Sequence, residues 1–335
     1  MKSSSSLNFL LVKLELLEDF IYPFLKYSIQ MKKHINILIV LMAVLLFQES
    51  QAQQDPQYTQ YMYNMNVVNP AYAGSKESLS LTALYRNQWS GIDENPVTFT
   101  FSAHKPISDK IGLGLSAIKD ELGPVNETNV YADFSYTIQV ASSVKLALGL
   151  KAGATFHEVG LSNLELQDPN DPFFNEDINN TYANIGAGAF LYGDNFYVGL
   201  SVPNMLKSVH LDENGMKYGS ETNHYFATAG YVFQVSENFK LKPSVMVKSA
   251  FDAPVSYDGN LNALFYDRFE LGASYRLDDS FSGLVGFQIN PNIRIGYAYD
   301  HVTSDLKTVG PASHEVVLTF DLFFKPRVLR SPRFF

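Results

Sequence analysis

The sequence predicts an all-β fold, a transmembrane antiparallel β-barrel of about 14 strands whose lumen is plugged by an N-terminal segment. Three observations predict this fold. Apolar and polar residues alternate in one run after another, the links between the runs alternate between short and long, and an export signal stands near the N-terminus.

The composition is that of a folded protein that does not bind nucleic acid. Of the 335 residues 46% are hydrophobic and 18% charged, and no linker-like stretch divides the chain. The absence of cysteine excludes disulfides, thiolate metal sites, cysteine nucleophiles and a lipidated N-terminal cysteine. The net charge of −9 argues against binding to phosphates.

The N-terminal region is an export signal. Residues 31–52 form a predicted signal peptide, in which two lysines precede the apolar run 35–47, and Ser50 and Ala52 precede the cleavage site. A transmembrane helix is the alternative, but the run is well short of the roughly 20 residues that span a bilayer. Residues 1–30 fit no targeting pattern and are predicted to be an upstream extension from a mis-called start.

Apolar and polar residues alternate along most of the predicted barrel, residues 78–324. In the run 144–156, Leu148 and Leu150 fall on one face and Lys151 falls on the other. Many of the runs approach the roughly 9–11 residues with which a tilted strand crosses a bilayer. The predicted strands are 79–87, 97–104, 111–119, 130–138, 144–156, 182–192, 196–202, 225–235, 240–251, 257–265, 269–277, 281–289, 293–300 and 315–324.

Alternation alone also fits a soluble sandwich or barrel, so the location rests on other features. Short links alternate with long ones, as in outer-membrane barrels, although the link 278–280 is short where a long one is expected. Tyr and Phe recur near strand ends, where membrane barrels carry aromatic girdles. The short links are 105–110, 139–143, 193–195, 236–239, 266–268 and 290–292, and the long ones include 157–181, 203–224 and 301–314.

The polar face of the strands carries charges of both signs. Because buried ions must be paired, this mixture favours a salt-bridged, filled lumen over an open pore. Together with the signal peptide, it places the protein in the outer membrane of a Gram-negative cell. The charges are Arg86, Lys145, Lys151, Lys242, Lys248, Arg276, Arg294, Asp133, Glu270, Asp300, Glu315 and Asp321.

Three stretches of the chain, 54–75, 85–107 and 331–335, resemble the PorP/SprF family of type IX secretion outer-membrane proteins. The similarity covers the whole chain after residue 52. The N-terminal motif residues are Asp55, Pro56, Tyr58, Gln60, Tyr61, Met62, Asn69, Pro70, Ala71, Tyr72, Ala73 and Gly74, and those of the barrel are Arg86, Gln88, Trp89, His104 and Pro106.

The resemblance implies a barrel that serves protein secretion and gliding. Family members work with type IX secretion components, and many help to deliver or anchor a secreted surface protein, often an adhesin. The expected surroundings are outer-membrane lipid, and the expected partners are that secreted protein and the secretion components.

The first residues after the signal peptide, 53–77, are predicted to form the plug. Asp55 and Pro56 fit an N-cap followed by proline, which predicts a short helix over 56–64. Asn69 precedes a proline, and Gly74 permits a tight reversal into the first strand. We expect Asn69 and Tyr72 to bond to the charged wall. The alternative is a flexible N-terminal tail.

The C-terminal residues 325–335 form a basic tail with four positive charges and no negative one. An even number of strands places both termini in the periplasm, where the tail can dock on a partner. A barrel-assembly signal is an equally good interpretation. The residues concerned are Arg330, Ser331, Pro332, Arg333, Phe334 and Phe335.

No pattern in the sequence indicates catalysis, a metal or a cofactor. The histidines lack i, i+4 spacing, G-x-S-x-G does not occur, and Gly186 and Gly188 lack the helix of a dinucleotide site. The protein is therefore not expected to be an enzyme. A solvated acidic loop is favoured over a calcium site for the oxygen donors Asp168, Asn170, Asp171, Glu176 and Asp177.

A channel for a hydrophobic solute is the second functional hypothesis. A barrel of about 14 strands with an N-terminal Asn-Pro-Ala segment also resembles the FadL-like transporters of long-chain fatty acids. Co-purification of a secreted protein would favour the first hypothesis, and solute uptake would favour the second.

Overall fold

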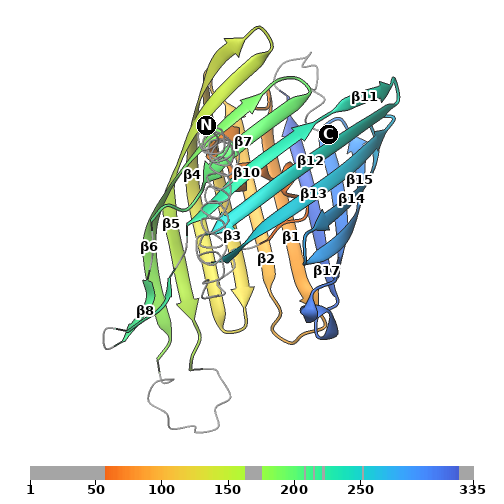
Figure 1. Cartoon of the computed structure of the whole chain (residues 1–335). Helices are drawn as coiled ribbons and strands as arrows, with labels where there is room; N and C mark the ends of the chain where they lie inside the picture. Colours follow the sequence, from red (N-terminus) through yellow and green to blue (C-terminus); the bar gives the residue numbers. More distant parts are fainter. Residues whose placement is uncertain are drawn as a thin grey trace, which may run out of the picture. The chain divides into compact units, whose positions relative to one another are not determined.

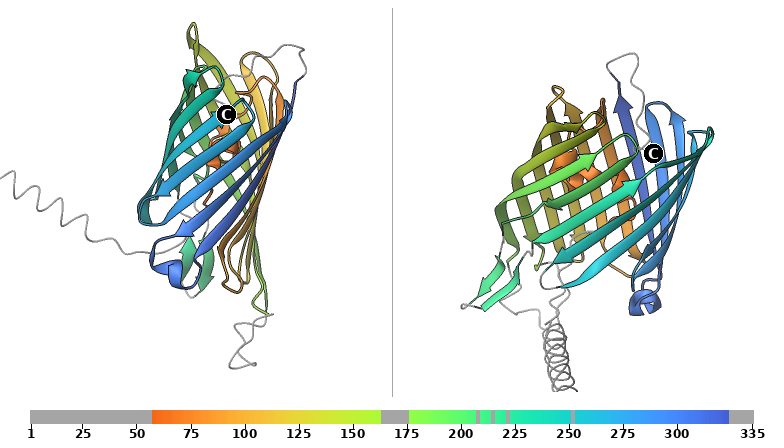
Figure 2. Two further views of the ribbon diagram at one scale, coloured as in Figure 1. Left: turned by 90° about the vertical axis from the view of Figure 1, so that its right-hand side faces the viewer. Right: turned by 45° about the horizontal axis from the view of Figure 1, so that its top comes forward.

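Antiparallel strands pair with their neighbours along the chain and close into a barrel of 14 strands, which confirms the predicted fold class (Figure 1, Figure 2). The closing pair is β1 (Leu79–Ser90) with β17 (Ala312–Leu322). The computed structural model describes residues 57–162, 176–206, 209–213, 216–220, 223–250 and 253–323. All of them belong to the unit Gln51–Phe335.

The other barrel strands overlap the predicted runs, with ends that differ by up to five residues, as at the start of β4. They are β2 (Val97–Pro106), β3 (Ile111–Leu122), β4 (Val125–Ala141), β5 (Val144–Val159), β6 (Ile178–Tyr192), β7 (Phe196–Val202), β10 (His224–Tyr231), β12 (Phe239–Ala250), β13 (Ala253–Phe265), β14 (Phe269–Arg276), β15 (Ser280–Asn290) and β16 (Ile293–Val302).

One predicted strand, 225–235, is divided in the structure. The N–H of Val232 donates to the carbonyl oxygen of Asn195 at 2.7 Å, beyond the last β10–β7 pair, Tyr231 with Phe196. Because β7 begins at Phe196, the strand loses this partner there, and β11 (Phe233–Ser236) continues the pairing with β12 alone.

The two ends of the barrel differ in their links. The short-turn end carries the links 107–110, 142–143, 193–195, 266–268 and 291–292, and the long-loop end carries the links 91–96, 160–177, 203–223 and 303–311. The predicted alternation is only partly right, because three links at the long-loop end are short. Residues 251–252 join β12 to β13, residues 277–279 join β14 to β15 as the sequence indicated, and Gly123 and Pro124 alone join β3 to β4. Gly123 has a φ of 54°, which glycine adopts without strain and which allows so tight a turn.

Two of the long links contain structure that the sequence did not predict. A separate hairpin, β8 (Val209–Glu213) with β9 (Met216–Ser220), lies between β7 and β10. A 3₁₀ turn, η4 (Asp305–Thr308), lies between β16 and β17. Among the described residues, no helix is long and apolar enough to cross a membrane.

The apolar face of each strand points outward and the polar face points into the lumen. Leu150 is 63% exposed, whereas Lys151 is buried. Ten of the twelve predicted polar-face charges are buried, and only Lys145 and Lys248 are half-buried. This is the arrangement of a barrel in lipid, where apolar side chains meet the hydrocarbon.

Aromatic side chains pair near both ends of the outward face. Phe239 and Phe265 stack at the short-turn end with ring centroids 5.0 Å apart. Tyr275 and Phe281 pair at the long-loop end with centroids 4.4 Å apart. These pairs lie at strand ends, where an aromatic girdle is expected.

We predict that Leu150→Arg destabilises the barrel by about 2–4 kcal/mol, the cost of an arginine on a lipid face near the bilayer midplane. Leu150 lies beside Phe134 of β4, in the middle of the outward apolar row. Urea unfolding in lipid vesicles measures the loss. The control is Asp93→Arg in the link 91–96, and an equal loss in both variants would contradict a lipid-facing Leu150.

Candidate functional site

Residues 57–77, hereafter the plug, lie inside the ring of strands, and most of their side chains are buried (Figure 2). Three short turns make up its ordered backbone: η1 (Tyr61–Tyr63), α2 (Met65–Val68) and η2 (Pro70–Tyr72). The rest of the predicted plug, including Asp55 and Pro56, lies outside the described residues, as do the predicted signal peptide, the upstream extension and the C-terminal tail Arg330–Phe335.

The predicted helix over 56–64 is wrong for the residues described. Before Tyr61 the backbone is irregular, because Thr59 and Gln60 donate their N–H groups to the Glu315 carboxylate rather than to a helical turn. The prediction at Asn69 is better, since its side chain caps η2 by accepting from the N–H of Ala71 at 3.0 Å. Gly74 has a φ of 72°, as expected for a tight reversal.

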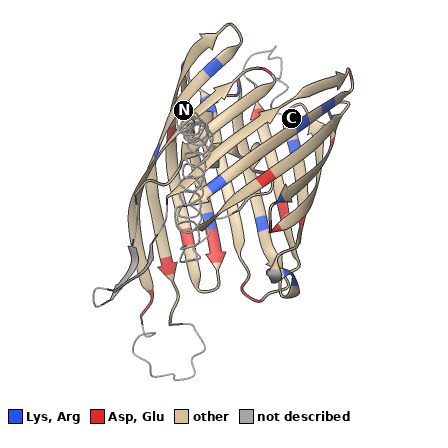
Figure 3. Ribbon diagram, in the orientation of Figure 1, with Lys and Arg blue, Asp and Glu red and all other residues tan. Residues whose placement is uncertain are grey.

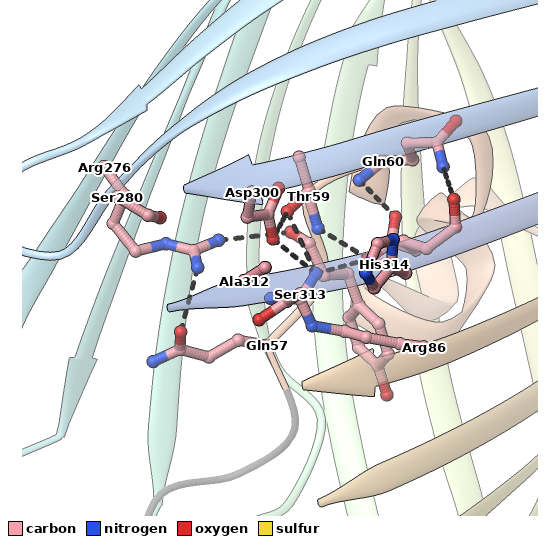
Figure 4. Close-up of polar contacts among 12 residues, drawn as sticks. Gln57, Thr59, Gln60, Arg86, Arg276, Ser280, Asp300, Ala312, Ser313 and His314 are labelled. Carbon is pink, nitrogen blue, oxygen red and sulfur yellow. Dashed lines mark hydrogen bonds and ion pairs between the residues drawn. The ribbon is translucent and has the colours of Figure 1, made fainter. Parts of the chain in front are cut away.

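The first anchor of the plug is a buried ion cluster at the closing pair of strands (Figure 4). Arg86 of β1 lies 2.7 Å from the Asp300 carboxylate and 3.1 Å from the Glu315 carboxylate. The two oxygens of Glu315 accept from the N–H groups of Thr59 and Gln60 at 2.9 and 2.7 Å. The carboxylate therefore neutralises Arg86 and binds the plug backbone at the same time.

The second anchor is Arg276, the last residue of β14 (Figure 4). Its guanidinium forms an ion pair of 2.6 Å with Asp258. It also donates to the Gln57 side chain at 2.9 Å and to the Tyr58 carbonyl oxygen at 3.4 Å. Gln57 and Tyr58 are thereby held at the long-loop end of the lumen.

The third anchor surrounds Tyr63. The Tyr63 hydroxyl donates to the Glu270 carboxylate, which also pairs with Arg294. The Arg294 guanidinium lies over the Tyr63 ring, 3.6 Å from its centroid, and the Lys242 ammonium lies 5.0 Å from it. Cations over an aromatic face are favourable contacts, so the Tyr63 ring stabilises both cations and the Glu270 carboxylate pairs with Arg294.

Two further ion pairs complete the contacts with the charged wall. Lys151 pairs with Asp133 at 3.0 Å, and Asn66 of the plug donates to the same carboxylate at 3.0 Å. At the short-turn end, Lys76 pairs with Asp321 at 3.2 Å. The Lys76–Asp321 pair joins the plug to β17 directly, whereas the Lys151–Asp133 pair joins β5 to β4 and reaches the plug only through Asn66.

Glycines of β3, β5, β6 and β7 form a cradle for the Asn69–Gly74 segment. A Cβ added at Gly149 of β5 would collide with the backbone of Pro70 and Ala71, and one added at Gly112 of β3 would collide with the Ala73 carbonyl. Gly188 of β6 and Gly199 of β7 face the Asn69 side chain in the same way. The plug backbone can approach the wall this closely only because these positions lack side chains.

The plug also supplies much of the apolar core. Its buried apolar residues pack with apolar residues of the wall, among them Phe190 and Met246. The ring of Tyr72 meets the rings of His104 and Phe190 edge-on, with centroids 5.2 and 5.4 Å away. The plug members of this core are Tyr58, Tyr61, Met62, Met65, Val67, Ala71 and Tyr72.

The contact of Asn69 differs from the predicted bond to the charged wall. Asn69 donates to the backbone carbonyl oxygen of Ala189 at 3.0 Å. The ring of Tyr72 contacts His104 and Phe190, and a bond from Tyr72 to the charged wall stays a prediction.

The barrel motif residues divide into two groups. Arg86, His104 and Pro106 adjoin the plug, and the Nδ1 of His104 accepts from the N–H of Gly74 at 3.2 Å. Gln88 and Trp89 instead lie at the long-loop end, near the end of β1. The N–H of Trp89 donates to the Ser313 hydroxyl at 3.0 Å, at a φ of 53° that a bulky residue rarely adopts.

The acidic loop lies largely outside the described residues, including Asp168, Asn170 and Asp171. The described Asp177 is exposed and accepts from the N–H of Ser162 at 2.9 Å, and this bond holds the pKa of its carboxyl below the ordinary value. Within the described ranges, no group of three or more His, Cys, Asp or Glu side chains could hold a metal ion.

Sequence reasoning missed several residues of the site. Tyr63, Asn64 and Asn66 contact the wall but lie outside the motif residues. The glycines of the cradle could have been noticed in the sequence, because they fall on the polar face of four predicted strands, where a side chain is expected. Carboxylate, amide and hydroxyl groups of the wall point at the plug. The arrangement can therefore bind a polypeptide backbone.

Comparisons with known proteins agree with this architecture. The model of a family described as type IX secretion system membrane protein PorP/SprF matches residues 50–320. No curated protein matches the chain.

Several solved structures are similar to this chain at low sequence identity. A FadL homologue of Pseudomonas aeruginosa is 13% identical, with 82% of this chain and 96% of that one covered and a TM-score of 0.47. The toluene transporter TbuX of Ralstonia pickettii is 10% identical, with 78% and 93% covered and a TM-score of 0.48. The outer membrane protein Omp33 of Acinetobacter baumannii is 10% identical, with 73% and 99% covered and a TM-score of 0.43.

We predict that Arg86→Gln lowers the free energy of unfolding by about 3–5 kcal/mol, because it leaves two buried carboxylates without their cation. Denaturant unfolding in lipid vesicles measures the loss. Lys119→Gln is the control, because the side chains of Lys119 and its partner Glu121 are 53% and 44% exposed, and such pairs contribute about 0–1 kcal/mol. Similar losses in the two variants would show that the cluster does not hold the plug.

We also predict that Gly149→Ala displaces the plug from its cradle. Limited proteolysis of the folded barrel should then cut the segment 61–69 much faster than in the unaltered protein. Gly259→Ala is the matched control, because a Cβ added there meets no atom within 4 Å. Equal cleavage of the two variants would argue against the cradle, and rapid cleavage of the unaltered protein would support a flexible tail.

Proposed function

The chain belongs to the PorP/SprF family of type IX secretion system membrane proteins, and we propose that it binds a secreted surface protein, such as an adhesin, and helps to deliver it or hold it at the outer membrane. The family and the barrel fold place the protein in that membrane. To the family and the location, the proposal adds a secreted protein as the partner and the role of binding it. It includes no catalytic role.

The filled lumen is the observation that carries the proposal. Buried ion pairs and an apolar core join the plug to the wall over the length of residues 57–76. A conducting pore needs a water-filled path, and a tightly held plug opposes one. A barrel of this kind is better suited to presenting its surfaces to other proteins than to passing solutes.

In this proposal the short-turn end faces the periplasm, because outer-membrane barrels keep short turns on that side. The end of β17 is then periplasmic, and the basic C-terminal tail that follows it can meet periplasmic secretion components. The long-loop end faces outward and meets the secreted protein.

The charge of the long-loop end supports a partner with a basic surface. Acidic side chains outnumber basic ones on the described links and strand ends there (Figure 3). Attraction between exposed charges falls with ionic strength, so the association should weaken as salt rises. The acidic residues are Asp93, Glu94, Asp120, Glu121, Glu127, Glu158, Glu176, Asp177, Asp278 and Asp279, against Lys119, Lys248, Lys307 and the buried Arg276.

A channel for a hydrophobic solute remains the second candidate, but the space between the plug and the wall is small. The crevice there has a volume of about 10 Å³, which is room for about one water molecule. Tyr58, Phe226 and Met246 line it together with the charged Lys248, Asp258 and Arg276. A solute that passed this way would have to move the plug from its anchors.

Purification from native outer membranes separates the two functions. We predict that an affinity tag in the link 142–143, away from the proposed docking end, recovers a secreted surface protein in stoichiometric amount after mild solubilisation. Recovery should fall at high salt and should be lost in cells that lack type IX secretion.

If the protein is a solute channel, the opposite result is expected in this purification. If no secreted protein is recovered with or without crosslinking, and uptake of a hydrophobic solute falls when the gene is deleted, the proposed function is wrong. Uptake that is unchanged by deletion would argue against the channel.

A further inference from the structure

The plug makes its contacts in an order that runs from one end of the barrel to the other. Its first described residue, Gln57, bonds to Arg276, where β14 ends at the long-loop end. Gly74 lies against Pro106 and Gly112, which flank the turn between β2 and β3 at the short-turn end. Lys76 pairs with Asp321, one residue before β17 ends at that same end.

Most contacts between these ends keep the same order. The exception is the Tyr63 side chain, which reaches Glu270 and Arg294, the second residues of β14 and β16, near the short-turn end. Gln60 binds Glu315, which lies closer to the long-loop end of β17 than Asp321 does. Asn66 binds Asp133, near the middle of β4. The plug therefore crosses the lumen once, from the long-loop end to the short-turn end. A segment folded back on itself would place Gln57 beside Lys76, whereas the two residues bond to opposite ends of the barrel.

The single pass changes the expected position of the N-terminus. An even number of strands places the start of β1 and the end of β17 at the same end, which was the basis for expecting both termini in the periplasm. That argument holds for the strands, and Leu79 does pair with Leu322. It does not hold for Gln57, because the plug carries the chain through the lumen before β1 begins.

We infer that the N-terminal end of the plug is displayed on the outer side of the membrane, having passed through the protein's own barrel. This rests on the orientation proposed above. The molecule then offers the N-terminal end of its plug to partners outside the cell and the end of β17 to partners in the periplasm. The surface for an external protein partner comprises Gln57 together with the acidic long-loop end.

The chain lacks cysteine, so single introduced cysteines can test this inference without background. Gln57→Cys and Glu77→Cys mark the two ends of the plug, where Gln57 is half-buried and Glu77 is exposed. Asp93→Cys in the link 91–96 and Ser142→Cys in the link 142–143 mark the two ends of the barrel, and both residues are exposed.

A maleimide that cannot cross the outer membrane is applied to intact cells and again after permeabilisation. We expect Gln57→Cys to label in intact cells, as Asp93→Cys does, and Glu77→Cys to label only after permeabilisation, as Ser142→Cys does. Labelling of Gln57→Cys only after permeabilisation, with Asp93→Cys labelled in intact cells, would overturn the inference. Reversed labelling of Asp93→Cys and Ser142→Cys would instead overturn the orientation, and the inference with it.

A second variant covers the case in which Gln57→Cys fails to fold or labels in neither state, since Arg276 loses a contact there. It carries an epitope inserted between Gln54 and Asp55, with antibody binding to intact cells as the readout. Binding without permeabilisation is the expected result, and binding only after permeabilisation overturns the inference. A heat-dependent shift in gel migration shows which variants form the barrel.

Discussion

A bilayer offers no hydrogen bonds to the polypeptide backbone, and the rest of this structure depends on that constraint. It requires the sheet to close, which the pairing of β1 with β17 does. Closure turns every polar face inward and brings charges of both signs into a narrow lumen, where they have little access to water. Arg86, Lys151 and Glu315 are all buried and must be paired.

The plug supplies hydrogen-bonding groups to those buried charges. This explains why it is built from turns rather than from one regular helix. Glu315 and Arg276 take up backbone groups of residues 57–60, so these groups are not available to a helix. Further along, small residues of the plug meet glycines of the wall, and the backbones come into contact. The plug and the barrel therefore stabilise each other, and neither would bury its polar groups well without the other.

The same arrangement bears on function. A lumen that is occupied by its own chain leaves the ends of the barrel as the surfaces for other proteins, and the two ends differ in loop length and in charge. Because the plug passes through the lumen once, it gives the molecule a different chain segment at each end. These features support the proposed function, in which the barrel binds a secreted protein outside and meets secretion components in the periplasm.

The sequence by itself determined the strands, their inward and outward faces and the mixed charges of the lumen, because a period of two is a local property that side chains such as Leu150 and Lys151 reveal directly. It also marked Asn69 and Gly74 as special backbone positions. Only the tertiary structure decided which charges pair, how the plug is held and in which direction it runs. The physical reason is that these contacts join residues far apart in the chain: Thr59 and Glu315 are separated by 256 positions, and no local pattern encodes such a pairing.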